Sequence, residues 1–332
     1  NGVVQSCPSL LLEPASTNLI TYSEAFDNAY WTKSGSSVVS GFTSPKGDLS
    51  AFKLVEDTST GVHRVQRAVT TSGSGSFSYS VFLKKGERTN VLLDVFNSGG
   101  AEFDLENGLF LSSTSTSSNI EPFANDWYRC TISGTLSSTS TTIYLYLRDG
   151  GSYQGDGTSG VYIYGAMLEA NSVASSYIPT NGSTVQRAAE TCNESGNSEV
   201  FNSEQGVLFA NIQGLNELYR LGVSENASTS NRILIGQSSS ALSYIVTSNS
   251  TTVVNNNVSG YGLNQKLKIA AKYKQNDFAF WVNGFEVITV SSGNTPTNLN
   301  SLDLKGQGFN AYIKTKEIGY YDTALTDEEL ET

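Results

Sequence analysis

The segment GVYIYGAMLEANSVASSYIPTNGSTVQRAAE, residues 160–190, decides how the first half of this chain folds. In VYIY at 161–164 aliphatic and tyrosine side chains alternate, and a period of two predicts a strand whose two faces meet different surroundings. Beyond Glu169 the alternation gives way to Asn, Ser and Thr with one proline, which favours an irregular path over a surface. The segment therefore predicts the last buried strand of a domain, followed by the tail that ends it.

Length and composition indicate the architecture around this segment. The chain has 332 residues, which suits two domains of about 150 residues, each able to bury roughly two-thirds of its unfolded surface. Charged residues make up only 15%, while Gly, Tyr and Phe are abundant. Strand-like segments follow one another at a spacing of about 10 to 15 residues, separated by Gly, Ser, Thr and Asn. This cadence predicts an all-β chain with two jelly-roll or β-sandwich domains in tandem.

The polar stretch ETCNESGNSEVFNS at 190–203 marks the expected connection between the domains. We therefore expect a first domain over residues 1–190, a linker over 191–205 and a second β domain over 206–332.

Two local signals are specific in the second domain. Asn283-Gly284 predicts a tight hairpin, because a type I′ turn needs positive φ at both central positions. Thr326, followed three residues later by Glu329, predicts the capping box of a short terminal helix.

Net charge, hydropathy and cysteine content limit the binding partners and the cross-links that can be expected. The formal net charge of −11 repels phosphate backbones, so no nucleic-acid partner is expected. No apolar stretch approaches the roughly 20 residues that a membrane helix needs, so no membrane insertion is expected. The sequence begins without Met or a signal peptide, which is typical of a processed or cut start. Cys7, Cys130 and Cys192 are too few for a disulfide framework; a contact between Cys7 and Cys192 and three separate thiols both stay open.

Four stretches carry a family resemblance. SLLLEPASTNLITYSEAFDNAYWTKSG at 9–35 and GAMLEANSVASSYIPTNGSTVQRAAET at 165–191 resemble the two ends of a jelly-roll module of bacteriophage tail and virion surface proteins. This module is similar in layout to galactose-binding-like carbohydrate-binding modules. KIAAKYKQNDFAFWVNGFEVITV at 268–290 and IKTKEIGYYDTALTDEELE at 313–331 resemble the concanavalin A-like or laminin-G-like fold of lectins and adhesins.

The resemblance implies a non-enzymatic protein of the virion surface, outside cells, as part of a tail fibre, spike or capsid appendage. Its implied partners are glycans or polysaccharides of the host-cell surface and other virion subunits, and a homotrimer is a further expectation. Two alternatives stay open: a purely structural virion subunit, and a carbohydrate-binding module of a secreted polysaccharide-degrading enzyme. Folds of this kind host many functions, so the ligand must be argued from a site.

Catalytic candidates are sparse. His63 is the single histidine, and no G-x-S-x-G elbow accompanies it to support a Ser-His-Asp triad. Asp94, Glu102, Asp104 and Glu106 could in principle supply paired carboxylates for glycoside hydrolysis, but a solvated acidic surface is the simpler interpretation. The strand motifs of polysaccharide lyases are absent from residues 206–332. The sequence therefore favours binding over catalysis.

The ligand-binding prediction rests on strands with alternating tyrosines. In TTIYLYLRDGG, Tyr144, Tyr146 and Arg148 point to the side opposite the aliphatic residues, and Tyr162 and Tyr164 do the same in VYIYG. If the two strands share a sheet, these five residues form one polar-aromatic face. Tyrosine rings stack on sugar rings and Arg supplies fixed donors, so we predict a glycan site there. The alternative is that the tyrosines pack beneath loops or against a neighbouring subunit.

Structural calcium is the one cofactor that the sequence suggests. The loop from Asp149 to Asp156 offers two carboxylates and flexible carbonyl groups, although it lacks the EF-hand spacing. Glu24 and Glu169 form a second candidate pair, implied by the resemblance to jelly-roll modules. The alternative for all four is a hydrated surface carboxylate.

Overall fold

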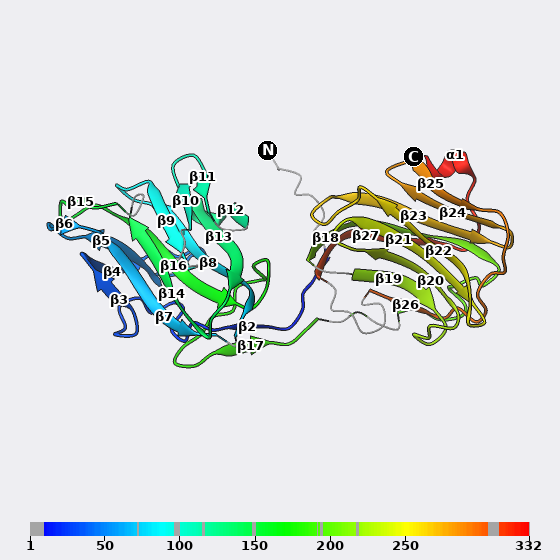
Figure 1. Cartoon of the computed structure of the whole chain (residues 1–332), viewed down its shortest axis with the longest axis horizontal. Helices are drawn as coiled ribbons and strands as arrows, with labels where there is room; N and C mark the ends of the chain where they lie inside the picture. The colour runs from blue at the N-terminus through cyan, green and yellow to red at the C-terminus, as the bar shows by residue number, and fades with distance from the viewer. Residues whose placement is uncertain are drawn as a thin grey trace. The chain divides into compact units, whose positions relative to one another are not determined.

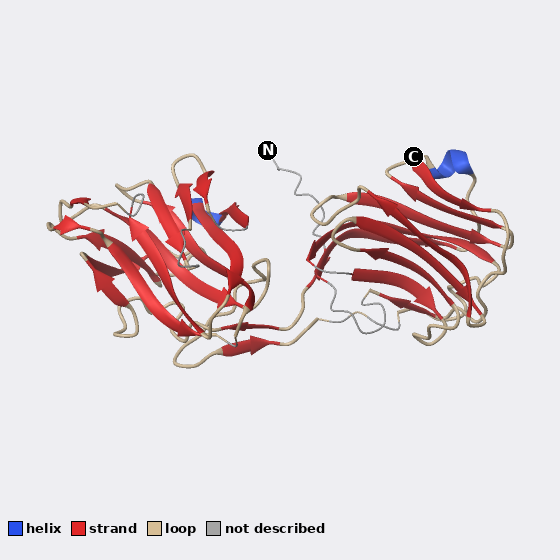
Figure 2. Cartoon of the chain, in the orientation of Figure 1, coloured by secondary structure: helices blue, strands red, loops and turns tan. Residues whose placement is uncertain are grey.

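The computed structural model describes residues 10–71, 73–95, 100–114, 117–147, 151–190, 192, 195–216, 219–304 and 312–331. The chain divides into two compact units: Ala15–Ala188, and Asn1–Pro14 together with Ala189–Thr332. Strands make up most of both units (Figure 2). In each unit two antiparallel sheets enclose an apolar core, so the prediction of an all-β chain with two sandwiches is confirmed.

The unit Ala15–Ala188 contains two large sheets, each named here for one of its tyrosines (Figure 1). The Tyr144 sheet has the order β11 (Leu109–Ser113), β10 (Ala101–Asp104), β9 (Asn90–Asp94), β14 (Ser140–Leu147), β7 (Arg64–Thr70) and β3 (Thr32–Ser34). The Tyr164 sheet has the order β12 (Ser117–Phe123), β13 (Trp127–Leu136), β8 (Gly75–Lys85), β16 (Gly160–Glu169), β5 (Ala51–Glu56) and β4 (Ser36–Phe42). The smaller elements are β2 (Ser16–Asn18) with β17 (Val185–Arg187), β6 (Thr60–Gly61) with β15 (Tyr153–Gln154), and the turn η1 (Ala124–Asp126).

The core of this unit follows from the alternation seen in the sequence. Ile143 and Leu145 of β14 and Val161 and Ile163 of β16 are all buried in the same apolar cluster. Because successive side chains of a strand point to opposite faces, the tyrosines between them lie on the outer faces of their sheets.

The tail at 170–187 returns to the start of the unit. Its strand β17 pairs with β2, and the backbone N–H of Thr180 donates to the Ser23 hydroxyl over 2.8 Å. The fully buried Glu169 accepts hydrogen bonds from the backbone N–H of Ser175 at 2.8 Å and from the Ser175 hydroxyl at 2.7 Å. The tail is therefore fastened to both ends of the domain that it closes.

The second unit also has two sheets. One has the order β1 (Leu10–Leu12), β27 (Tyr312–Tyr321), β18 (Gln205–Asn216), β23 (Leu267–Lys274), β24 (Asp277–Val282) and β25 (Phe285–Val290). The other has the order β22 (Thr251–Ser259), β21 (Ala241–Ser248), β20 (Arg232–Gln237), β19 (Tyr219–Ser224) and β26 (Ser301–Asp303). The helix α1 (Asp327–Leu330) follows the last strand, and among the described residues no helix has the length and apolar character to cross a membrane.

Both local signals of this unit appear in the structure. Asn283 and Gly284 have φ of 52° and 81° and join β24 to β25, as predicted. The Thr326 side chain accepts from the backbone N–H of Glu329, whose carboxylate accepts from the backbone N–H of Thr326 at 2.8 Å. The capping box is confirmed. Trp281 lies with Leu330 of α1 in a small apolar cluster apart from the main core of the unit.

The division of the chain differs from the expected boundaries at 1–190, 191–205 and 206–332. β1 pairs with β27 of the second unit, because its buried Leu12 joins that core and the strand covers an otherwise open sheet edge. The expected linker also packs on the second unit: Phe201 is buried in its core and Ser195 pairs with Leu302. Cys7 lies outside the described residues.

Candidate functional site

The five residues predicted to form one glycan-binding face do not do so. β14, with Tyr144 and Tyr146, and β16, with Tyr162 and Tyr164, belong to opposite sheets of the sandwich. The prediction assumed that the two strands share a sheet, and the loop between them instead carries the chain from one sheet to the other. Arg148 lies outside the described residues.

Tyr144 and Tyr146 remain together on the outer face of the Tyr144 sheet. Their rings are stacked, with centroids 5.5 Å apart and an interplanar angle of 24°, and both are partly exposed. The guanidinium carbon of Arg64 lies 5.0 Å from the centroid of Tyr144 and 5.3 Å from that of Tyr146. One guanidinium nitrogen donates to the Tyr146 hydroxyl over 2.9 Å. This cluster, which we call the tyrosine–arginine face, is planar, aromatic and polar.

The neighbouring strands place further polar groups beside the rings. Tyr144 is paired with Gln66 of β7 on one side and with Asp94 of β9 on the other. The side-chain oxygen of Gln66 is buried and accepts no hydrogen bond within the described part of the chain. Burial raises the pKa of Tyr146 although Arg64 opposes the shift, so the phenol stays protonated at neutral pH and keeps a donor.

Arg64 and Gln66 are functional candidates that sequence reasoning missed. They lie in HRVQRAV at 63–69, where polar and aliphatic residues alternate as they do in β14. The pattern shows that both side chains point outward, but it does not show that β7 is the neighbour of β14. That pairing, with Arg64 opposite Tyr146, is a property of the topology.

Tyr162 and Tyr164 lie on the outer face of the Tyr164 sheet, where Tyr162 is partly exposed beside Phe42 and Tyr164 is buried. Tyr164 is only 2% exposed; its hydroxyl contacts the Glu24 carboxylate, and the Tyr177 ring lies 6.0 Å from its own. Gly165, with φ of 57°, lets β16 bulge here, and a Cβ at this position would lie only 3.0 Å from the Tyr177 ring. For Tyr164 the alternative interpretation of packing beneath loops is therefore the right one.

The calcium candidates are placed separately. Asp156 accepts hydrogen bonds from Thr158 and Ser159, which hold the pKa of its carboxyl well below the usual range. Glu24 contacts Tyr164 and lies 3.5 Å from Lys46, whereas Glu169 is buried among hydroxyl and amide donors. Asp149 lies outside the described residues. Within the described ranges, no three His, Cys, Asp or Glu side chains gather as metal ligands would.

His63 belongs to a buried cluster that holds the loop between β14 and β16. Its ring nitrogens contact the carbonyl oxygens of Gly35 and, at 3.2 Å, Tyr153. The Tyr153 hydroxyl donates to the buried Glu56 over 2.6 Å, and Arg88 makes two hydrogen bonds to the same carboxylate, at 2.6 and 2.9 Å. Burial raises the pKa of Glu56, but the hydrogen bonds from Arg88 and Tyr153 outweigh it and leave the pKa below its ordinary value.

The carboxylates considered for glycoside hydrolysis have local partners. Asp104 accepts from the backbone N–H groups of Glu106 and Asn107, and Glu102 accepts from the Asn90 side chain. Glu106 forms an ion pair with Lys85 at 2.5 Å. These contacts fix turns and strand neighbours, and they agree with the interpretation of these groups as a surface.

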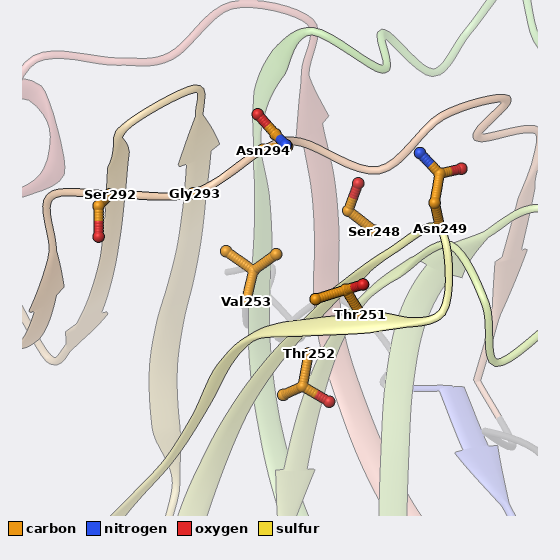
Figure 3. A pocket seen from close by; sticks show the side chains of 8 residues that line it. All are labelled: Ser248, Asn249, Thr251, Thr252, Val253, Ser292, Gly293 and Asn294. Carbon is orange, nitrogen blue, oxygen red and sulfur yellow. The ribbon is translucent and has the colours of Figure 1, made fainter.

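The second unit has a polar hollow at one end of its sandwich (Figure 3). The cavity measures about 370 Å³ and is lined by the turn between β21 and β22 and by residues 292–294. Asn249 and Asn294 lie toward the top of this view, and the Val253 side chain lies below Asn294 (Figure 3). The Ser248 hydroxyl donates to the Thr295 carbonyl over 2.8 Å, which ties the two sides together. The lining offers neutral hydrogen-bonding groups and no charge.

Comparisons with known proteins give structural similarity but no family. No protein family model matches the chain, and no curated protein matches it. Among solved structures, the chain is similar to domains LG4-5 of the mouse laminin α1 chain, with 8% identity and a TM-score of 0.28. The match covers 81% of this chain and 90% of that chain. A structural neighbour is thus a laminin G domain pair, and these findings give no support for a bacteriophage origin. The expected virion protein stays a prediction.

Proposed function

We propose that the chain is a carbohydrate-binding protein and that the tyrosine–arginine face contacts the sugar. The observation that carries the proposal is the stacked pair Tyr144 and Tyr146 beside the guanidinium of Arg64, on the outer face of a sheet. Aromatic rings pack against the apolar faces of sugar rings, and the phenol and guanidinium groups supply donors of fixed direction. A face held together by its own stacking loses little side-chain entropy when a ligand binds.

The order of the strands suggests how a glycan would lie. Gln66, Tyr144 and Asp94 follow one another across β7, β14 and β9, nearly perpendicular to the strands. The buried oxygen of Gln66 accepts no hydrogen bond within the described part of the chain, and a sugar hydroxyl would supply the donor once the side chain turns outward. We infer that an extended polysaccharide crosses the strands along this row.

The proposed setting is a virion surface, where the chain would form part of a tail fibre, spike or capsid appendage and contact host-cell glycans and other virion subunits. The support for this setting is the resemblance of residues 9–35 and 165–191. Structural calcium, as proposed from the sequence, would stabilise loops and take no part in sugar recognition. A structural subunit would bind no glycan, whereas a module of a secreted enzyme would bind the polysaccharide that its enzyme degrades.

A glycan array followed by retention on immobilised polysaccharide tests the proposal. Tyr146→Ala removes one ring of the stack and the acceptor of Arg64, so it should abolish binding. Tyr144→Phe keeps the stack, and the Tyr144 hydroxyl makes no hydrogen bond within the described part of the chain; it should retain most binding. Phe123→Ala is the matched control, because Phe123 is an exposed aromatic residue of the other sheet.

Two results would contradict this function. One is that the wild type binds no glycan on the array, which would favour the structural alternative. The other is that Tyr146→Ala binds as well as Phe123→Ala, which would place the sugar elsewhere, the polar hollow of Figure 3 being the next site to mutate.

A further inference from the structure

Within the described part of the chain, the strand β11 is an open sheet edge with an unusual surface. It pairs with β10 on one side and ends the Tyr144 sheet on the other (Figure 1). Its consecutive residues Leu109, Phe110 and Leu111 are 53%, 44% and 45% exposed. Both faces of the strand therefore present large apolar side chains to solvent. Single exposed apolar residues are common on proteins, but a continuous exposed run on an edge strand marks a surface that another chain covers.

Three other edges of the sheets carry devices that normally block strand addition. β3 carries Lys33, β12 carries Glu121 and Pro122, and β25 carries Glu286. Charges and proline at such positions prevent a second strand from pairing. β11 has the sequence LFLSS, which contains no charge, no proline and no glycine. The edge strand β22 also lacks these devices, but its sequence TTVVNNNVS presents mainly Thr and Asn to solvent. β11 differs from both kinds of edge because it exposes a continuous apolar run, which we take as a surface that receives a strand.

The charge of the molecule indicates which strand would be received. The chain carries a formal net charge of −11, so two copies repel each other over most of their surface. Residues 107–120 contain no charged side chain at all. On β11 itself a second copy can therefore approach with no charge at the junction, and the carboxylates of Glu102 and Asp104 lie one strand away, on β10. An antiparallel pairing of β11 with itself is also isologous, so one patch supplies both sides of the contact.

We propose that β11 pairs antiparallel with β11 of a second copy of this chain and joins two Tyr144 sheets into one continuous sheet. The local two-fold axes of an antiparallel pair are perpendicular to the sheet. The outer face of one Tyr144 sheet therefore continues into the outer face of the other. Both tyrosine–arginine faces of the dimer then open to the same side. If the proposed function holds, the dimer presents two sugar-binding faces to one polysaccharide surface and gains avidity.

Sedimentation velocity of the full chain over a range of concentrations tests the pairing. Leu109→Lys together with Leu111→Lys places two charges from each copy at the new junction, and the dimer should dissociate at a concentration at least tenfold higher than for the wild type. Phe285→Lys is the matched control, because Phe285 is 72% exposed on the edge strand β25 of the other unit. It should leave the dimer unchanged.

A second variant and a second measurement test whether the added lysine charges alone explain the loss of the dimer. Phe110→Ser removes the central ring without adding charge and should weaken the dimer in the same direction. The lysine variant should also bind an immobilised polysaccharide roughly a hundredfold more weakly, with unchanged affinity for a single soluble oligosaccharide.

Three outcomes would overturn the pairing: a wild-type monomer at every concentration, a trimer, or a dimer that is insensitive to the β11 variants. A wild-type dimer that binds no glycan would refute the proposed function and leave the pairing intact.

Discussion

The two outer faces of the unit Ala15–Ala188 begin from one sequence pattern and end in opposite surroundings. YLY in β14 and YIY in β16 both alternate tyrosine with a buried aliphatic residue. Tyr144 and Tyr146 stay partly exposed, whereas Tyr164 is enclosed by Tyr177, Phe82 and the Glu24 carboxylate. The difference teaches that alternation fixes which residues leave the core, while the loops decide whether an outward face becomes a surface or a second small core.

The largest effect that follows from this comparison concerns Tyr164. Tyr164→Ala empties an enclosed aromatic site, and we expect the unit to lose about 4 kcal/mol of unfolding free energy, as for other large buried aromatic side chains. Urea denaturation monitored by hydrogen exchange in peptides from residues 15–188 measures the loss. Tyr144→Ala in the same assay should cost about 1 kcal/mol or less. Equal losses for the two variants would remove the distinction between the faces.

The alternation of buried and outward residues could be predicted from the sequence, but which of the two sheets each strand joins could not. A period of two predicts that the aliphatic residues of these strands, such as Ile143 and Val161, face the core, and both are buried. The condition that β14 and β16 share a sheet is not met, because strand order depends on pairings distant in the sequence, such as Tyr146 with Arg64. The same reason hid the pairing of β1 with β27. Edge strands such as β12, which contains Pro122, also lack the apolar alternation that marks a strand.

The second prediction concerns the cluster that holds the crossing between the two sheets. Glu56→Ala leaves Arg88 and Tyr153 without their shared acceptor, and we expect a loss of about 3 kcal/mol, at the lower end for a broken buried ion pair because Arg88 reaches solvent. Hydrogen exchange should rise first in the loop between β14 and β16. Unchanged exchange there would mean that the cluster does not hold the crossing.

A third, smaller effect is acid sensitivity of the same loop. The folded pKa of Glu56 lies below its ordinary value, so its stabilisation is fully present above about pH 4.5 and is lost as the pH falls through the folded pKa. The loss should be smaller than for Glu56→Ala, because a protonated carboxyl still accepts some of these hydrogen bonds. Urea midpoints between pH 3 and pH 7, as approximate limits chosen around the carboxyl range, measure it. In Glu56→Gln this part of the pH dependence should disappear, and an identical pH profile would show that other carboxylates carry it.

The smallest effect on stability is expected for a substitution in the tyrosine–arginine face. This substitution separates the contribution of the face to folding from its contribution to sugar binding. Arg64→Lys keeps the positive charge but loses the planar guanidinium that lies beside both rings. On a solvent-exposed face this exchange should change the unfolding free energy by less than about 0.5 kcal/mol. Sugar binding should nevertheless fall several-fold, because the donor geometry and the ring contacts change together. Isothermal titration with an oligosaccharide found on the array measures the affinity, and urea denaturation of the same sample measures the unfolding free energy. A variant that loses stability without losing affinity would show that Arg64 supports the fold of this face and does not contact the sugar.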